Sequence, residues 1–145
     1  MGDIISGSTG LPTPGTWYYI QVNGSGAYLG DARFDHCIVK YGGKNYTGEL
    51  CNVYFYATEY GYFKNSTIEH SSNGGLRIHS CSNIGFDNNE IANNGSYGVQ
   101  FYSSAIDITN CEISGNGAEG IYVTGSGALI NNCTIANNQS HGILT

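Results

Sequence analysis

Aromatic and polar residues recur at alternate positions in a series of short apolar segments, such as "NVYFY", "LRIHS", "VQFYS" and "IYVTG". Alternate residues of a β-strand point to opposite faces, so these side chains would share one outward surface. An aromatic ring offers an apolar face and tyrosine adds a hydroxyl, a combination suited to binding a sugar. The sequence therefore predicts a candidate glycan-binding face formed by Tyr54, Tyr56, Arg77, His79, Gln100, Tyr102 and Tyr122.

The same face has a second interpretation without any ligand. Tyrosine is a good strand residue, and tyrosines paired across neighbouring strands stabilise a sheet by themselves. The sequence leaves both interpretations open.

Carboxylates are the next groups with chemical potential. Hydrolysis of a glycosidic bond uses two carboxylates about 5 to 10 Å apart, and the predicted face contains none. Glu90 and Glu112 recur one repeat apart on a different strand, with Glu69 nearby, but their small neighbours offer no pocket wall. We expect a solvated acidic stripe there and no catalytic residues.

The chain has five cysteines and no C-x-x-C pair. The odd count argues against a complete disulfide framework, and the missing pair argues against a zinc or thioredoxin-like site. Cys111 and Cys133 are expected to be reduced thiols that fill small spaces in the core. No EF-hand or glycine- and aspartate-rich calcium repeat occurs, so we expect no metal and no cofactor.

The charge balance limits the partners. Five Lys and Arg residues against eleven Asp and Glu residues give a net charge of -6, which repels nucleic acid and anionic lipid. No run of 18 apolar residues and no basic leader followed by an apolar segment occurs, so neither a membrane span nor a signal peptide is expected in this chain.

These residues must be positioned by a repeat, because two short apolar phrases recur along the chain. The first positions of one phrase are Phe34, Phe63, Phe86, Ile108 and Ile130, separated by 29, 23, 22 and 22 residues. A second phrase follows a glycine-rich turn in "GGLRI", "YGVQF", "EGIYV" and "HGIL". Strands this short bury their apolar sides only when successive copies stack. The period therefore predicts an all-β fold, a parallel β-solenoid of about six coils.

Asparagines mark the turn between two of these strands. The residue before each inward Cys, Ser or Asn position is His36, Asn65, Asn88, Asn110 or Asn132. Asparagine tolerates the left-handed backbone of a sharp turn, and stacked amides can bond to neighbouring coils. We expect a structural ladder here, and a second set of asparagines at the next corner formed by Asn94, Asn116 and Asn138.

Phrases such as "NCEISGNGAEGIYV" and "NNEIANNGSYGVQF" resemble the right-handed parallel β-helix repeats of the pectate-lyase-like superfamily. The resemblance covers residues 16 to 145 and implies a right-handed solenoid. It also implies that the sheet bearing the aromatic face is the one where polysaccharide enzymes of this kind bind substrate. Lyases of the superfamily use a basic residue near calcium or a neutralising arginine; Arg77 and His79 match that requirement only in residue type, without an acidic cluster beside them.

We expect a flexible leader over residues 1–15 and a single β-helix domain over residues 16–145, which is a fragment of a longer solenoid. The last repeat stops early, so the C-terminal end of the solenoid is expected to be uncapped and to allow homo-oligomers. The first coil is longer than the others, and its insertion carries Lys40, Tyr41, Lys44, Tyr46 and Glu49 without a recognisable motif.

The sequence favours a noncatalytic scaffold or binding module from a larger extracellular or cell-surface protein. The alternative is a carbohydrate-binding or polysaccharide-lyase-like module that uses the aromatic face. Polysaccharide is accordingly the partner to test.

Overall fold

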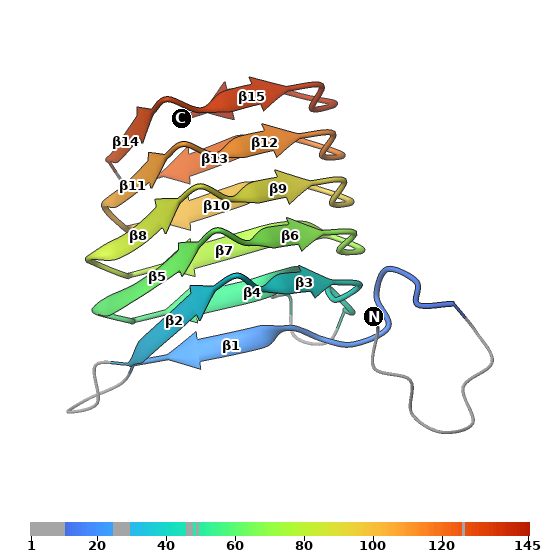
Figure 1. Cartoon of the computed structure of the whole chain (residues 1–145), viewed down its shortest axis with the longest axis horizontal. Coiled ribbons are helices and arrows are strands. Elements are labelled where there is room, and N and C mark those ends of the chain that lie inside the picture. Colours follow the sequence, from blue (N-terminus) through green and yellow to red (C-terminus); the bar gives the residue numbers. More distant parts are fainter. Residues whose placement is uncertain (1–10, 25–29, 46–47, 49, 126) are drawn as a thin grey trace.

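The computed structural model describes residues 11–24, 30–45, 48, 50–125 and 127–145. Over this part of the chain the secondary structure is entirely β, and the strands wind into a stacked solenoid (Figure 1). Three strands make one coil, and every pair of neighbouring strands within a sheet is parallel. The predicted parallel β-solenoid is confirmed. No helix able to span a membrane is present among the described residues.

The strands form three sheets. Sheet A contains β1 (Ile20–Asn23), β4 (Cys51–Tyr56), β7 (Gly74–His79), β10 (Val99–Tyr102), β13 (Ile121–Thr124) and β16 (Ile143–Leu144). Sheet B contains β2 (Asp31–Asp35), β5 (Tyr60–Lys64), β8 (Ile84–Asp87), β11 (Ile106–Thr109) and β14 (Ala128–Asn131). Sheet C contains β3 (Ile38–Lys40), β6 (Thr67–Glu69), β9 (Glu90–Ala92), β12 (Glu112–Ser114) and β15 (Thr134–Ala136).

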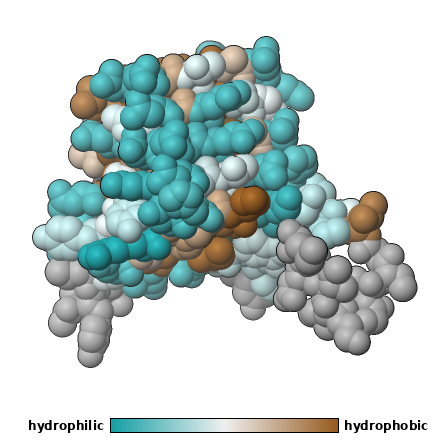
Figure 2. Space-filling view, viewed as in Figure 1, coloured by the Kyte–Doolittle hydropathy of each residue, from teal (hydrophilic) through white to brown (hydrophobic). Residues whose placement is uncertain are grey.

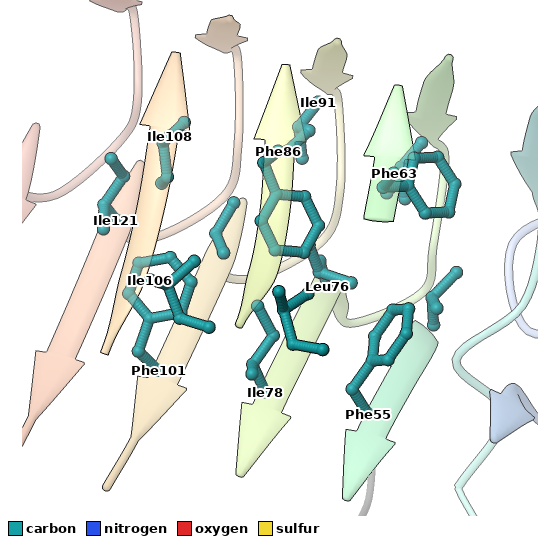
Figure 3. Close-up of a cluster of buried hydrophobic side chains, with 14 of the residues drawn as sticks. Phe55, Phe63, Leu76, Ile78, Phe86, Ile91, Phe101, Ile106, Ile108 and Ile121 are labelled. Carbon is teal, nitrogen blue, oxygen red and sulfur yellow. The ribbon is translucent and has the colours of Figure 1, made fainter. Parts of the chain in front are cut away.

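Equivalent residues of successive coils lie directly over one another. Phe86 pairs in register with Ile108, and Ile108 pairs with Ile130. Inward residues of the central coils are fully or nearly fully buried, as Figure 3 shows for Phe86, Ile108 and Ile121. Equivalent inward side chains of successive strands therefore stack into hydrophobic columns that run along the solenoid.

Aromatic stacking reinforces the core near its N-terminal end. The rings of Phe34 and Phe63 are 4.8 Å apart between centroids and nearly parallel, with 20° between their planes. Phe55 of sheet A meets Phe86 of sheet B edge to face at 6.5 Å. Such pairs stabilise a core beyond the area that they bury.

Each corner of the coil contains a residue with left-handed backbone, followed by a residue that points inward. At the corner between sheets B and C these are the ladder residues His36, Asn65, Asn88, Asn110 and Asn132, with φ between 49° and 54°. At the corner between sheets C and A they are Tyr41, His70, Asn93, Gly115 and Asn137. Between sheets A and B the residues with left-handed backbone are Ala57, Ser80, Ser103 and Gly125. The left-handed residue turns the chain sharply enough for the next strand to start a new face.

The inward corner residues join consecutive coils by hydrogen bonds. Asn94 Oδ1 accepts from the backbone amide of Ser71 in the preceding coil at 3.0 Å. Asn94 Nδ2 also donates to the carbonyl of Ile68 in that coil, at 3.3 Å. The same kind of link recurs at the other corners, where the Cys37 amide donates to Ser66 Oγ and the Cys81 amide to Ser104 Oγ. Buried polar groups at the corners are thereby satisfied by a neighbouring coil.

Glycines immediately precede β10 and β13 of sheet A for a steric reason. A Cβ at Gly98 would lie 2.7 Å from the carbonyl oxygen of Gly120, and one at Gly120 would lie 2.7 Å from that of Gly142. Each of these carbonyls accepts a ladder bond from the strand of the preceding coil, so it cannot move away. The close approach of consecutive coils at this point excludes any side chain.

The N-terminal segment is bonded to the first coil. Gly15 donates its backbone amide to the carbonyl of Gly42 at 3.0 Å, and the indole of Trp17 donates to the carbonyl of Lys40 at 3.0 Å. Residues 1–10 of the predicted leader lie outside the described part of the chain. The end of that leader at Gly15 is therefore attached to the solenoid by a backbone hydrogen bond.

All five cysteines are free. Cys51, Cys81 and Cys111 are buried, whereas Cys37 and Cys133 are half-buried. Burial raises the pKa of Cys81, and it raises the pKa of Cys111 to about 11. These values fit thiols that act as small apolar side chains.

Candidate functional site

The outward side chains of sheet A lie in two parallel rows that follow the solenoid axis. We call Tyr56, His79 and Tyr102 the aromatic row; they are in register on β4, β7 and β10. The inner row lies two residues earlier on the same strands and on β13, and it consists of Tyr54, Arg77, Gln100 and Tyr122. The structure thus brings all seven residues of the predicted face onto one surface.

The aromatic row is a set of interlocked rings. The His79 ring lies 5.1 Å from the Tyr56 ring and 4.7 Å from the Tyr102 ring between centroids, edge to face in both cases. Tyr56 is 37% exposed and Tyr102 is 45% exposed. Since each ring is held by its neighbour, the row presents a preformed aromatic strip to solvent.

Tyr54 differs from this picture, because it is only 4% exposed. The guanidinium carbon of Arg77 lies 5.5 Å from the centre of the Tyr54 ring, and the Tyr54 hydroxyl is 3.3 Å from His79 Nδ1. Tyr54 therefore points to the outer side of sheet A but is covered there. Its position supports Arg77 and His79 and leaves little of the ring to touch a ligand.

The long loop of the first coil reaches the inner row. Arg77 Nη1 donates to the carbonyl of Gly48 at 3.5 Å. Of the loop residues singled out in the sequence, Tyr46 and Glu49 lie outside the described residues. Lys40 and Tyr41 lie at the corner between sheets C and A, where Lys40 Nζ is 3.5 Å from Glu69 Oε1. The described part of the loop thus contacts the inner row through the hydrogen bond between the Gly48 carbonyl and Arg77.

Gln100 and Tyr122 complete the inner row towards the C-terminal coils. Both are half-buried, and they pair in register with each other. Gln100 also pairs with Arg77 on β7. They place an amide and a phenol beside the aromatic row, and both groups can donate and accept hydrogen bonds.

The carboxylates singled out in the sequence lie on sheet C. Glu90 and Glu112 are paired in register and exposed there, while Glu69 contacts Lys40 and His70. The described outward positions on the strands of sheet A carry no Asp or Glu. Nor do the described residues contain a group of three His, Cys, Asp or Glu side chains able to hold a metal ion.

The asparagine ladder on the outer corner contains two acidic residues, Asp35 and Asp87, that are not among the residues predicted from the repeat. Asn65 Nδ2 donates to Asp35 Oδ1 at 2.8 Å, and Asn88 Nδ2 donates to Asn65 Oδ1 at 2.8 Å. A second series starts from Asp87, whose Oδ1 accepts from Asn110 Nδ2 at 2.7 Å. Asn132 Nδ2 in turn donates to Asn110 Oδ1 at 2.6 Å. The ladder is therefore two short chains of amides, each ending on a carboxylate.

These amides change the acidity of both carboxyls. The hydrogen bond from Asn65 lowers the pKa of Asp35, and the bonds from Asn110 and Thr109 lower the pKa of Asp87. A donor that binds the ionised form favours it over the protonated form. The spacing of "FDN" and "FDH" relative to the ladder was the available signal, since each aspartate directly precedes a ladder position.

The solvent-facing surface opposite the aromatic row is mostly hydrophilic (Figure 2). The exposed large apolar side chains on sheets B and C include Leu129 on β14 and Ile38 on β3, which are separated by several coils. These two apolar side chains do not form a continuous patch, whereas the rings of the aromatic row on sheet A contact one another.

Comparison with protein families gives one result that covers nearly the whole chain. The family model described as "Right handed beta helix region" matches residues 18–145. Comparisons with curated proteins and with solved structures found no match. The in-register parallel strands and this match agree on one assignment. The chain belongs to the right-handed β-helix family.

Proposed function

We propose that this chain is a noncatalytic β-helix binding module of a larger surface or secreted protein, and that it binds polysaccharide on sheet A. The aromatic row of Tyr56, His79 and Tyr102 is the single observation that carries the proposal. Sugar rings have apolar C–H faces, which pack on aromatic rings, and hydroxyls, which bond to phenols, imidazoles and amides. A row of fixed rings loses little conformational entropy when it binds such a ligand.

The side chains beside the row support a role in binding. Glycoside hydrolysis uses a pair of carboxylates that flank the bond to be cleaved. The described outward positions on the strands of sheet A supply neither of these carboxylates. A lyase-like reaction would need a basic group that reaches the sugar, and Arg77, the matching residue, is held over Tyr54.

Affinity electrophoresis in gels that contain soluble polysaccharides tests the proposal. Tyr102→Ala removes an exposed ring of the row and should abolish retardation in the gel that retards the wild type. Tyr60→Ala is the matched control, because Tyr60 is 50% exposed but lies on sheet B. Tyr54→Ala is unsuitable as a probe of binding, since a buried ring contributes to folding.

Equal retardation of the wild type, Tyr102→Ala and Tyr60→Ala in every gel would leave only a scaffold role. Thermal unfolding of each variant checks that a lost interaction is not a lost fold. The extracellular or cell-surface location, the count of six coils, the uncapped C-terminal end and the homo-oligomers expected from the sequence stay predictions.

A further inference from the structure

Apart from Arg77, the side chains of the aromatic row and the inner row on sheet A carry hydrogen-bonding groups without fixed charge. Tyr56 and Tyr102 supply phenols on the aromatic row, and Thr124 continues the row with a hydroxyl on β13. Gln100 adds an amide beside them. Arg77 is the single Lys or Arg residue among the described residues on the strands of sheet A.

The Arg77 guanidinium is engaged within the protein. Its carbon lies 5.5 Å from the centre of the Tyr54 ring, a cation–π distance, and Nη1 donates to the Gly48 carbonyl. Recognition of a sugar carboxylate by arginine uses two parallel N–H donors directed at the same group. The contacts of Arg77 direct its guanidinium at the sheet and at the loop. Arg77 would therefore have to break its contacts with Tyr54 and Gly48 before it could bind a sugar carboxylate.

Most other cations of the chain lie on the remaining sheets and have partners there. Arg33 on sheet B pairs with Asp31 at 2.9 Å, and Lys40 on sheet C pairs with Glu69. Lys64 on sheet B lies 4.9 Å from the Tyr62 ring centre. With a net charge of -6, the field of the molecule also opposes the approach of a polyanion.

From these observations, and resting on the proposed function, we propose that the aromatic row selects neutral polysaccharides over acidic ones. The bound glycan runs along the solenoid axis, because the rings of successive coils follow one another at 5.1 and 4.7 Å in that direction. This advance is similar to that of one pyranose residue in an extended glycan. Hydroxyls of the bound sugars exchange hydrogen bonds with the phenols of the row and with the Gln100 amide.

The experiment uses native gels with hydroxyethyl cellulose, laminarin or galactomannan as neutral probes, and polygalacturonate or alginate as acidic probes. We expect retardation in at least one neutral gel, with an affinity that falls about tenfold or more in Tyr102→Ala, enough to abolish retardation at the same polysaccharide concentration. Tyr102→Phe keeps the ring and should retain most of that affinity. Added salt should leave the retardation unchanged, because screening acts on charged partners.

The outcomes separate the two proposals. Retardation only in acidic gels, weakened by salt, would overturn neutral selectivity and leave polysaccharide binding on sheet A in place if Tyr102→Ala abolishes it. Retardation in no gel, or retardation that Tyr102→Ala does not alter, would overturn both. Neutral binding that is lost in Tyr102→Ala and kept in Tyr60→Ala supports both.

Discussion

Asn94 donates two hydrogen bonds to a single atom of the next coil, Asn116 Oδ1, one from its backbone amide at 3.1 Å and one from its side chain at 3.0 Å. Asn116 Nδ2 donates back to the carbonyl of Ile91, which belongs to the same coil as Asn94. Asn116 is 0% exposed. One side chain therefore satisfies several backbone and amide groups of the coil before it.

Replacing the Asn116 side chain should destabilise the folded protein. Asn116→Ala leaves the Asn94 amide and the Ile91 carbonyl without their partners in a buried corner, and the loss should be about 3 kcal/mol of unfolding free energy. Chemical denaturation measures it. Asn93→Gly is the control at the same corner, because Asn93 is exposed with φ of 55°, which glycine adopts easily. A loss of similar size in both variants would contradict the role assigned to Asn116.

Two glycines, Gly98 just before β10 of sheet A and Gly85 within β8 of sheet B, should respond in opposite ways to alanine. Gly98→Ala places a Cβ 2.7 Å from the Gly120 carbonyl and 2.7 Å from Ile113 Cγ2, and should destabilise the protein by about 2 kcal/mol or more. A Cβ added at Gly85 on β8 would meet nothing within 4 Å, so Gly85→Ala should stabilise the strand by about 0.5 kcal/mol. Thermal unfolding of both variants compares them directly. The steric account fails if Gly98→Ala unfolds at the wild-type temperature.

The outer ladder should be visible in an acid titration. Asn110→Gly keeps a residue that tolerates φ of 54° but removes the donor to Asp87, so the pKa of Asp87 should rise towards its ordinary value. A carboxyl with a lowered pKa stabilises the folded state above the unfolded pKa, about 3.9, and loses this contribution as the pH falls through its folded pKa. NMR titration of the Asp87 carboxyl gives the shift.

Asn88→Gly controls for the titration, because Asn88 donates to Asn65 and not to Asp87. In this variant the titration of Asp87 should match that of the wild type. Equal shifts in the two variants would show that the ladder acts on Asp87 through general packing.

Thiol reactivity should follow burial. Iodoacetamide at mildly alkaline pH should label the half-buried Cys37 and Cys133 first. Cys81 and Cys111 should react only after unfolding, because they are buried and burial raises the pKa of each thiol. Mass spectrometry of peptides after short labelling times gives the order. Early labelling of Cys111 would mean that the coil formed by β10, β11 and β12 opens more readily than its packing indicates.

The repeat was predictable because it rests on local signals. The apolar columns through Phe86 and Ile108 recur at a constant spacing, and the turns between them carry Gly and Asn, so stacking was the consistent way to bury the apolar side chains. The outward position of Tyr56, His79 and Tyr102 followed from strand alternation.

Other features depend on contacts that have no period. Tyr54 is buried in contact with Arg77 and His79, and a loop present only in the first coil binds Arg77 through the Gly48 carbonyl. The contact of Asp87 with Asn110 depends on how the amide of one coil is oriented over the carboxyl of another. The burial of Tyr54 leaves no repeated sequence signal. The motifs "FDH" and "FDN" place each aspartate beside the ladder but do not show which amide it accepts from, because side-chain directions at a corner are set by the packed coils around them.

The corner bonds also have a direction along the chain. The backbone amides of Ser71, Asn94 and Asn116 each bond to a side chain that lies about one coil later in the sequence. During synthesis, the backbone amide at each new corner would remain bonded to water until the residues of the next winding have been synthesised. Order would therefore advance from the N-terminus and trail the growing chain by one turn, so that a pause in translation leaves only the newest winding open.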